Sequence, residues 1–266
     1  MDMTVREQLT EEMTSVVELV ELLKKNQKVE SAANVVAMAA YVGQIDTKLD
    51  QLLKEVNGVQ EQLKNVQEMN DKKSITVRLK ETLDSLAVQY NKLKEELKEI
   101  KNAMKQKAGE IVKAVKKLGV KALNGVAEFF KIGEKLKKFE DRTKTNLAKV
   151  DDTIDRLDKF GKGMDEAKNQ AAKSVSILTG KNERKNLKSI ASKIEVIKKP
   201  FVKEKEILEN ILQLTDKALN KCAKLSQEAK GWYPGEFVQG ENFYQTAGSV
   251  EKKQDDIVKK IGRKKR

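Results

Sequence analysis

Residues 42–66 read VGQIDTKLDQLLKEVNGVQEQLKNV, and this stretch decides the fold class. Its apolar side chains recur at steps of three and four: Val42, Ile45, Leu49, Leu52, Val56, Val59, Leu63 and Val66. This spacing puts them all on one face of an α-helix, and it is sustained for more than three heptads. Such a face is typical of a helix that packs along a second helix. The stretch therefore predicts a coiled coil.

A second stretch of the same kind follows a polar break at residues 69–74. Its apolar positions are Leu79, Leu83, Leu86, Tyr90, Leu93, Leu97, Ile100 and Met104. Two helices joined by a short turn usually pack side by side in opposite directions. We therefore expect residues 29–69 and 76–116 to pair antiparallel, with the two apolar faces against each other.

The composition agrees with long helices. Of 266 residues, 36% are charged, 5% are aromatic and two are proline. An apolar content of 39% suits narrow seams between helices, where about two positions in seven are buried. The predicted fold is all-α, built from elongated antiparallel coiled-coil hairpins or a helical bundle, with an irregular aromatic loop near the C-terminus.

Changes in pattern divide the chain into four regions. We expect an N-terminal helical hairpin region at 1–117, a basic amphipathic connecting helix at 118–139, a C-terminal helical bundle region at 140–230, and an aromatic loop with a basic tail at 231–266. One helix over residues 75–160 would be about 130 Å long, so a bend near Gly125 or Gly133 is expected. The glycines at 161 and 163 predict a stop or kink, and Pro200 a kink or restart.

The connecting region lies in the most basic part of the chain. Residues 98–138 contain twelve lysines and four glutamates, a net charge of +8 out of +13 for the whole chain. Its apolar positions form a helical face that includes Leu118 and Phe129. Phe130 falls at the edge of this face, and we expect a third helix from residues 187–225 to cover it.

Two groups of residues are candidates for binding. Six lysines within residues 98–138 are candidates for phosphate binding: Lys113, Lys116, Lys117, Lys121, Lys131 and Lys135. Aromatic side chains are candidates for protein interaction, because Trp and Tyr are favoured at interface hot spots: Phe129, Phe130, Trp232, Tyr233 and Phe237. The aromatic loop has a second interpretation, in which it folds back over a helix end.

The residue inventory argues against an enzyme. The chain has no histidine and one cysteine, Cys222, which excludes a histidine-based triad, a cysteine–histidine pair and a zinc cluster within it. No phosphate-binding loop motif is present. Asp151, Asp152 and Asp155 lie within one helical turn, and we interpret them as a solvated acidic face. We expect no catalytic residue, no cofactor and no metal site.

Three functions remain open on this basis. The first is a helical scaffold that associates with itself or with a protein partner. The second is nonspecific association with nucleic acid, since only seven of the fifty-four basic residues are arginine and base recognition favours arginine. The third is attachment to an anionic membrane surface through the basic amphipathic helix.

The longest uncharged run, residues 31–45, is shorter than the ~20 residues of a membrane span. No signal peptide is evident, and we expect a cytoplasmic protein.

Three short segments carry a resemblance: residues 120–132 (VKALNGVAEFFKI), 2–9 (DMTVREQL) and 199–205 (KPFVKEK). They resemble an uncharacterised all-helical family of Gram-positive gut bacteria, often carried on conjugative elements. The likeness extends over most of residues 1–228 and leaves out the aromatic loop and the basic tail. It implies a helical fold and a genetic setting, with no catalytic residue and no substrate.

Overall fold

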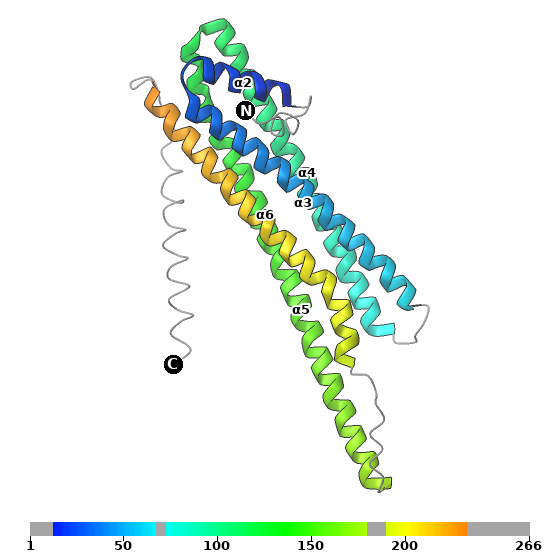
Figure 1. The fold of residues 1–266 in the computed structure, drawn as a ribbon. Coiled ribbons are helices and arrows are strands. Elements are labelled where there is room, and N and C mark those ends of the chain that lie inside the picture. The colour runs from blue at the N-terminus through cyan, green and yellow to red at the C-terminus, as the bar shows by residue number, and fades with distance from the viewer. Residues whose placement is uncertain (1–12, 68–72, 180–189, 233–266) are drawn as a thin grey trace, which may run out of the picture.

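The computed structural model describes residues 13–67, 73–179 and 190–232. Its main elements are helices, and these residues contain no β-strand: α2 Thr14–Lys25, α3 Val29–Gln67, α4 Lys73–Leu118, the 3₁₀-helix η2 Val120–Phe129, α5 Phe130–Thr179 and α6 Ile190–Trp232. Figure 1 shows α3, α4, α5 and α6 running along a common direction, with α2 and the turn between α4 and α5 at one end. The prediction of an all-α helical bundle is confirmed.

Helices α3 and α4 form the predicted antiparallel pair. Near the α2 end, Lys101 Nζ lies 2.5 Å from an oxygen of Asp46. Farther along, the Gln60 side chain donates a 2.8 Å hydrogen bond to Asp84. Residue numbers therefore rise along α3 while those of their partners fall along α4, as an antiparallel arrangement requires.

Helix α6 packs between α3 and α5 and closes the bundle. Lys203 of α6 lies 3.5 Å from Glu55 of α3, and Lys205 lies 2.7 Å from Asp151 of α5. Helices α4 and α5 are also in contact. Each long helix thus has two long neighbours, and successive helices run in opposite directions, which is the arrangement of an up-down four-helix bundle.

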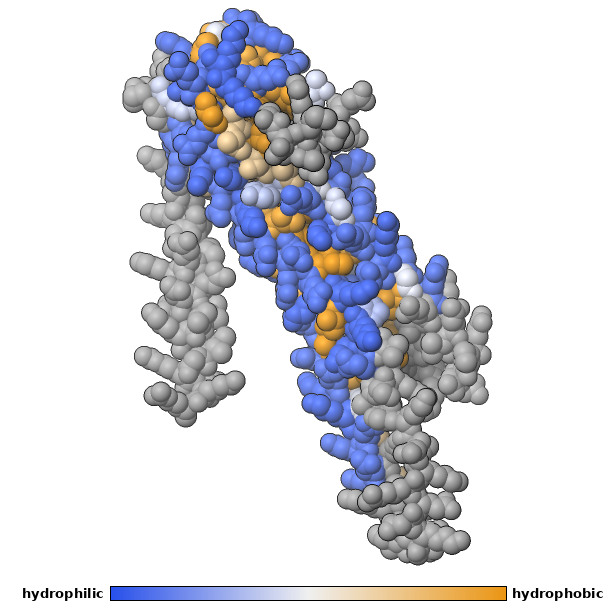
Figure 2. Space-filling model, in the orientation of Figure 1, coloured by the Kyte–Doolittle hydropathy of each residue, from blue (hydrophilic) through white to orange (hydrophobic). Residues whose placement is uncertain are grey.

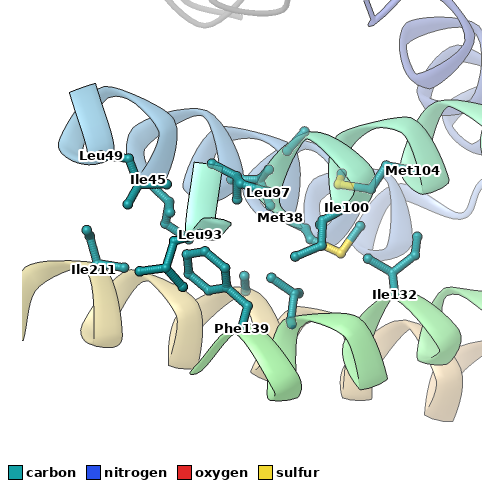
Figure 3. Packing of buried hydrophobic residues seen from close by; sticks show 14 of the residues in the cluster. Met38, Ile45, Leu49, Leu93, Leu97, Ile100, Met104, Ile132, Phe139 and Ile211 are labelled. Atoms are coloured by element: carbon teal, nitrogen blue, oxygen red, sulfur yellow. The ribbon is translucent and has the colours of Figure 1, made fainter. Parts of the chain in front are cut away.

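The core is one continuous column of apolar side chains along the bundle. Figure 3 shows the part where all four long helices contribute, with Ile45 and Leu49 from α3, Leu93 from α4, Phe139 from α5 and Ile211 from α6. Every described residue of the two predicted seams on α3 and α4 is buried: Val42, Ile45, Leu49, Leu52, Val56, Val59, Leu79, Leu83, Leu86, Tyr90, Leu93, Leu97, Ile100 and Met104. The apolar period therefore identified the buried face correctly.

The structure agrees with some of the predicted breaks and differs from others. Residues 75–160 do not form one helix, as expected: α4 ends at Leu118, the chain turns at Gly119, and Gly125 lies in the 3₁₀-helix η2, whereas Gly133 lies within α5. Helix α5 continues through Gly161 and Gly163 to Thr179, and α6 runs through Pro200. Tertiary contacts explain the continuity of α6, because Ile194 and Phe201 on either side of the proline are both buried.

The connecting region is therefore divided among three elements instead of forming one amphipathic α-helix. The 3₁₀-helix η2 covers residues 120–129, and the remaining residues of 118–139 belong to the end of α4 and the start of α5. η2 packs against both α4 and α6. Within the described ranges, no helix is both long enough and apolar enough to cross a membrane.

Candidate interaction surface at the α4 corner

A sharp corner joins α4 to η2, and we call residues 113–121 the α4 corner. Gly119 sits between the two helices with φ 84° and ψ −173°, a combination that is essentially restricted to glycine. The Gly119 N–H donates to the carbonyl of Val115 at 2.9 Å, and its carbonyl accepts from the Ala122 N–H at 3.1 Å. These two hydrogen bonds hold the turn on both sides of Gly119, so the backbone itself defines the shape of the corner.

Two aliphatic side chains flank the glycine and face solvent. Leu118 is 71% exposed and Val120 is 45% exposed. The apolar spacing had placed Leu118 on the face with Phe129, and this prediction is wrong, because α4 ends at Leu118 and its side chain is exposed. The missed signal was Gly119 itself, since a glycine that takes a positive φ turns the chain away from the packed face. Figure 2 shows hydrophobic surface among hydrophilic surface at this end of the molecule.

Four lysines and no acidic residue lie within the nine residues of the α4 corner. Lys113, Lys117 and Lys121 are exposed, and none forms an ion pair with another described residue. Lys116 lies 3.5 Å from Glu18 of α2, and both side chains remain largely exposed. At least three of the four charges thus have no counter-charge within ion-pair distance among the described residues.

The other two lysines proposed for phosphate binding have acidic partners. Lys131 lies 3.3 Å from Glu128, and Lys135 lies 3.6 Å from Glu99 on α4. Hydrogen bonds from Lys107 and then from Lys131 hold the pKa of Glu128 below its usual value. The structure therefore separates the six candidates into three corner lysines without an ion pair to another described residue and three lysines, including Lys116 of the corner, that neighbour a carboxylate.

The aromatic candidates lie in different environments. Phe129 is fully buried in the core and offers no ring to a partner. Phe130 is half-buried, with Lys131 Nζ 5.8 Å from the centre of its ring. Trp232 is the last residue of α6, half-buried, with Lys28 Nζ 4.7 Å from its ring. Tyr233 and Phe237, with the rest of the aromatic loop, lie outside the described residues.

The cysteine is buried, and two of the three aspartates considered above form ion pairs within the bundle. Burial raises the pKa of the Cys222 thiol to about 12, and its sulfur lies 3.0 Å from that of Met38. A protonated, buried thiol is unreactive. Asp151 pairs with Lys205, and Asp152 lies 2.7 Å from Arg156 on its own helix. No group of three or more Cys, Asp or Glu residues in the described ranges is arranged to hold a metal ion.

These features define an all-α bundle protein with a lysine-rich, partly apolar corner at one end. The chain belongs to a family of unknown function, DUF6674, whose model matches residues 12–266. The expectation of an uncharacterised helical family is confirmed. The match includes the aromatic loop and the basic tail, which the resemblance had left out, and it omits the segment 2–9. Comparison with curated proteins and with solved structures finds no match.

Proposed function

We propose that this protein is a non-enzymatic helical interaction protein that docks on a polyanionic partner through the α4 corner. The observation that carries the proposal is a set of three exposed lysines around a glycine-fixed turn, Lys113, Lys117 and Lys121, which form no ion pair within the part of the chain that the structure describes. Elsewhere along the bundle many lysines face a carboxylate across a helix interface, as Lys101 faces Asp46. At the corner, by contrast, the contact of Lys116 with Glu18 is the one ion pair that the described residues form.

The charge pattern favours a polyanion over a protein with a neutral surface. Four lysines in nine residues create a local positive potential, which attracts a polyanion and raises its rate of association. Lysine contributes a point charge on a flexible stem, whereas arginine supports bidentate recognition of particular groups. The proposed binding is therefore electrostatic, sensitive to salt and broad in its choice of partner. We also propose that the protein is cytoplasmic, in keeping with its single cysteine, which cannot form a disulfide within the chain.

Retention of the full chain on immobilised heparin tests the proposal. The triple variant Lys113→Gln, Lys117→Gln, Lys121→Gln, here the corner lysine variant, should elute at clearly lower salt than the parent. Binding to a short DNA duplex, used as a second polyanion, should lose about 0.9 units of salt slope per phosphate contact removed. Three contacts would thus flatten the slope by about three units.

The matched control is a second triple Lys→Gln variant, which changes the net charge by the same amount but on the sides of the bundle, away from the corner. Lys54, Lys80 and Lys92 are exposed and form no ion pair with another described residue. The variant Lys54→Gln, Lys80→Gln, Lys92→Gln, here the shaft lysine variant, should keep most of the retention on heparin. Equal losses in the two variants would mean that net charge alone drives binding, and the corner would then have no special role.

A further inference from the structure

Resting on the proposed function, we infer that the polyanionic partner is the surface of a lipid bilayer containing anionic lipids, with Leu118 and Val120 inserted at its interface. The third function left open by the sequence was membrane attachment through the apolar face of the connecting helix. Phe129, Ile132 and Phe139 of that face are fully or almost fully buried in the core. A membrane surface therefore cannot reach them in the folded bundle.

The corner presents a different apolar group, and its chemistry fits lipid. Leu118 and Val120 are among the few large apolar side chains that the bundle leaves exposed. A nucleic-acid backbone offers aliphatic side chains no apolar surface to bury, whereas the boundary between head groups and acyl chains does. Lysine side chains lay their methylene stems along an apolar surface and keep the ammonium group in water. Lysines beside exposed aliphatic residues can thus contact phosphate head groups while the aliphatic residues insert.

The position of the corner also suits contact with a flat surface. The turn between α4 and α5 lies at one end of the long bundle, beside α2 (Figure 1). A planar surface can meet the end of an elongated molecule without contacting its sides. The positive φ of Gly119 keeps Leu118 and Val120 on the two sides of one turn, so both side chains reach outward from the same place.

Binding to an anionic bilayer is expected to be of modest affinity and reversible. Each lysine near an anionic bilayer contributes roughly a fivefold gain in binding. The three exposed lysines Lys113, Lys117 and Lys121 would thus give on the order of a hundredfold over a neutral bilayer. Burying two partly exposed aliphatic side chains adds at least about tenfold. Attachment by one such element resembles attachment by a single acyl chain, which is reversible and needs a second contact to become stable.

The test uses the full chain and sedimentation with vesicles of phosphatidylcholine alone or of phosphatidylcholine mixed with phosphatidylserine. We expect binding to the anionic vesicles and little to the neutral ones. The corner lysine variant should lose on the order of a hundredfold in affinity, and the shaft lysine variant much less. The double variant Leu118→Ser, Val120→Ser should lose about tenfold on vesicles and keep its retention on heparin.

A matched apolar control is Val88→Ser, because Val88 is 53% exposed on α4 away from the corner. It should leave vesicle binding unchanged, and circular dichroism should show all variants folded. Vesicle binding that is insensitive to Leu118→Ser, Val120→Ser overturns the inference. Tight binding to duplex DNA without binding to vesicles assigns the partner to nucleic acid and also overturns it, while the proposed function stands. Unchanged heparin retention in the corner lysine variant overturns the proposed function as well.

Discussion

The hydroxyl of Tyr90 on α4 donates a 2.9 Å hydrogen bond to Oε2 of Glu204 on α6, inside the bundle. Both side chains are fully buried, and the other oxygen of Glu204, Oε1, has no hydrogen-bond partner among the described residues. Burial raises the pKa of Glu204 to about 7, the hydrogen bond from Tyr90 opposes this, and the nearby Glu55 adds to it. A charged carboxylate here is costly because, among the described residues, it has no ion-pair partner and only part of its hydrogen bonding.

The stability of the bundle should consequently fall as the pH rises through neutrality. The folded pKa of Glu204, about 7, lies above the ordinary value of 4.5. Between these values the folded state binds more protons than the unfolded state. The stabilisation is therefore complete below pH 4.5 and is lost as the pH rises through 7. At about 1.4 kcal/mol per pKa unit the full effect is of the order of 3 kcal/mol.

The variant Glu204→Gln isolates this effect, since glutamine keeps an oxygen that accepts from Tyr90 and carries no charge. Urea unfolding at pH 5 and pH 8 should give a variant that is more stable than the parent only at the higher pH. Tyr90→Phe is the companion measurement, and its cost should be larger at pH 8, where a hydrogen bond to a charged group is lost. Parallel pH profiles for parent and Glu204→Gln would contradict the assignment.

One glycine substitution should have opposite effects at two positions. Gly119→Ala should cost about 1–3 kcal/mol, because alanine is strained at the positive φ of this turn. Gly58→Ala should stabilise the protein by about 0.5–1 kcal/mol, because Gly58 lies within α3 with no atom near the added methyl group. Thermal midpoints measured side by side provide the comparison. A stabilising Gly119→Ala would show that the corner adopts another backbone conformation in solution.

A charge placed in the seam between α3 and α4 should unfold the bundle. Leu52 is fully buried, so Leu52→Asp buries an unpaired carboxylate and should abolish cooperative thermal unfolding or lower its midpoint strongly. Val88→Asp on an exposed position of α4 is the control and should be nearly silent. Far-UV circular dichroism follows both. An unchanged midpoint for Leu52→Asp would contradict the antiparallel pairing.

The two adjacent phenylalanines, Phe129 and Phe130, should differ in how much they contribute to the free energy of unfolding. Phe129 is fully buried, and Phe129→Ala should cost about 3–5 kcal/mol, as for other buried aromatic rings. Phe130 is half-buried, so Phe130→Ala should cost clearly less. The sequence had placed Phe130 at the edge of the apolar face under a third helix, and the structure leaves this ring half-buried. Equal losses in the free energy of unfolding would place Phe130 deeper in the core than the structure has it.

The sequence by itself determined the helices and their buried faces. Steps of three and four residues specify one face of a helix regardless of what packs against it, so Leu52 and Leu93 were identifiable as core from spacing alone. The short polar break between the two seams likewise predicted the antiparallel pair of α3 and α4. Lysine density around the α4 corner was also visible in the sequence, because charge is a property of composition.

Only the tertiary structure decided where helices end and which side chains are free. Glycines at 119, 125, 133, 161 and 163 look alike in sequence, yet the chain turns at Gly119, where φ is positive, and α5 continues through 161 and 163. A lysine becomes available when no carboxylate from another helix lies near it, which separates Lys113 from Lys135. Glu204 sits between two lysines in the sequence and is nonetheless buried beside Tyr90. These outcomes depend on neighbours that are distant in sequence, because burial and ion pairing are set by which helices meet.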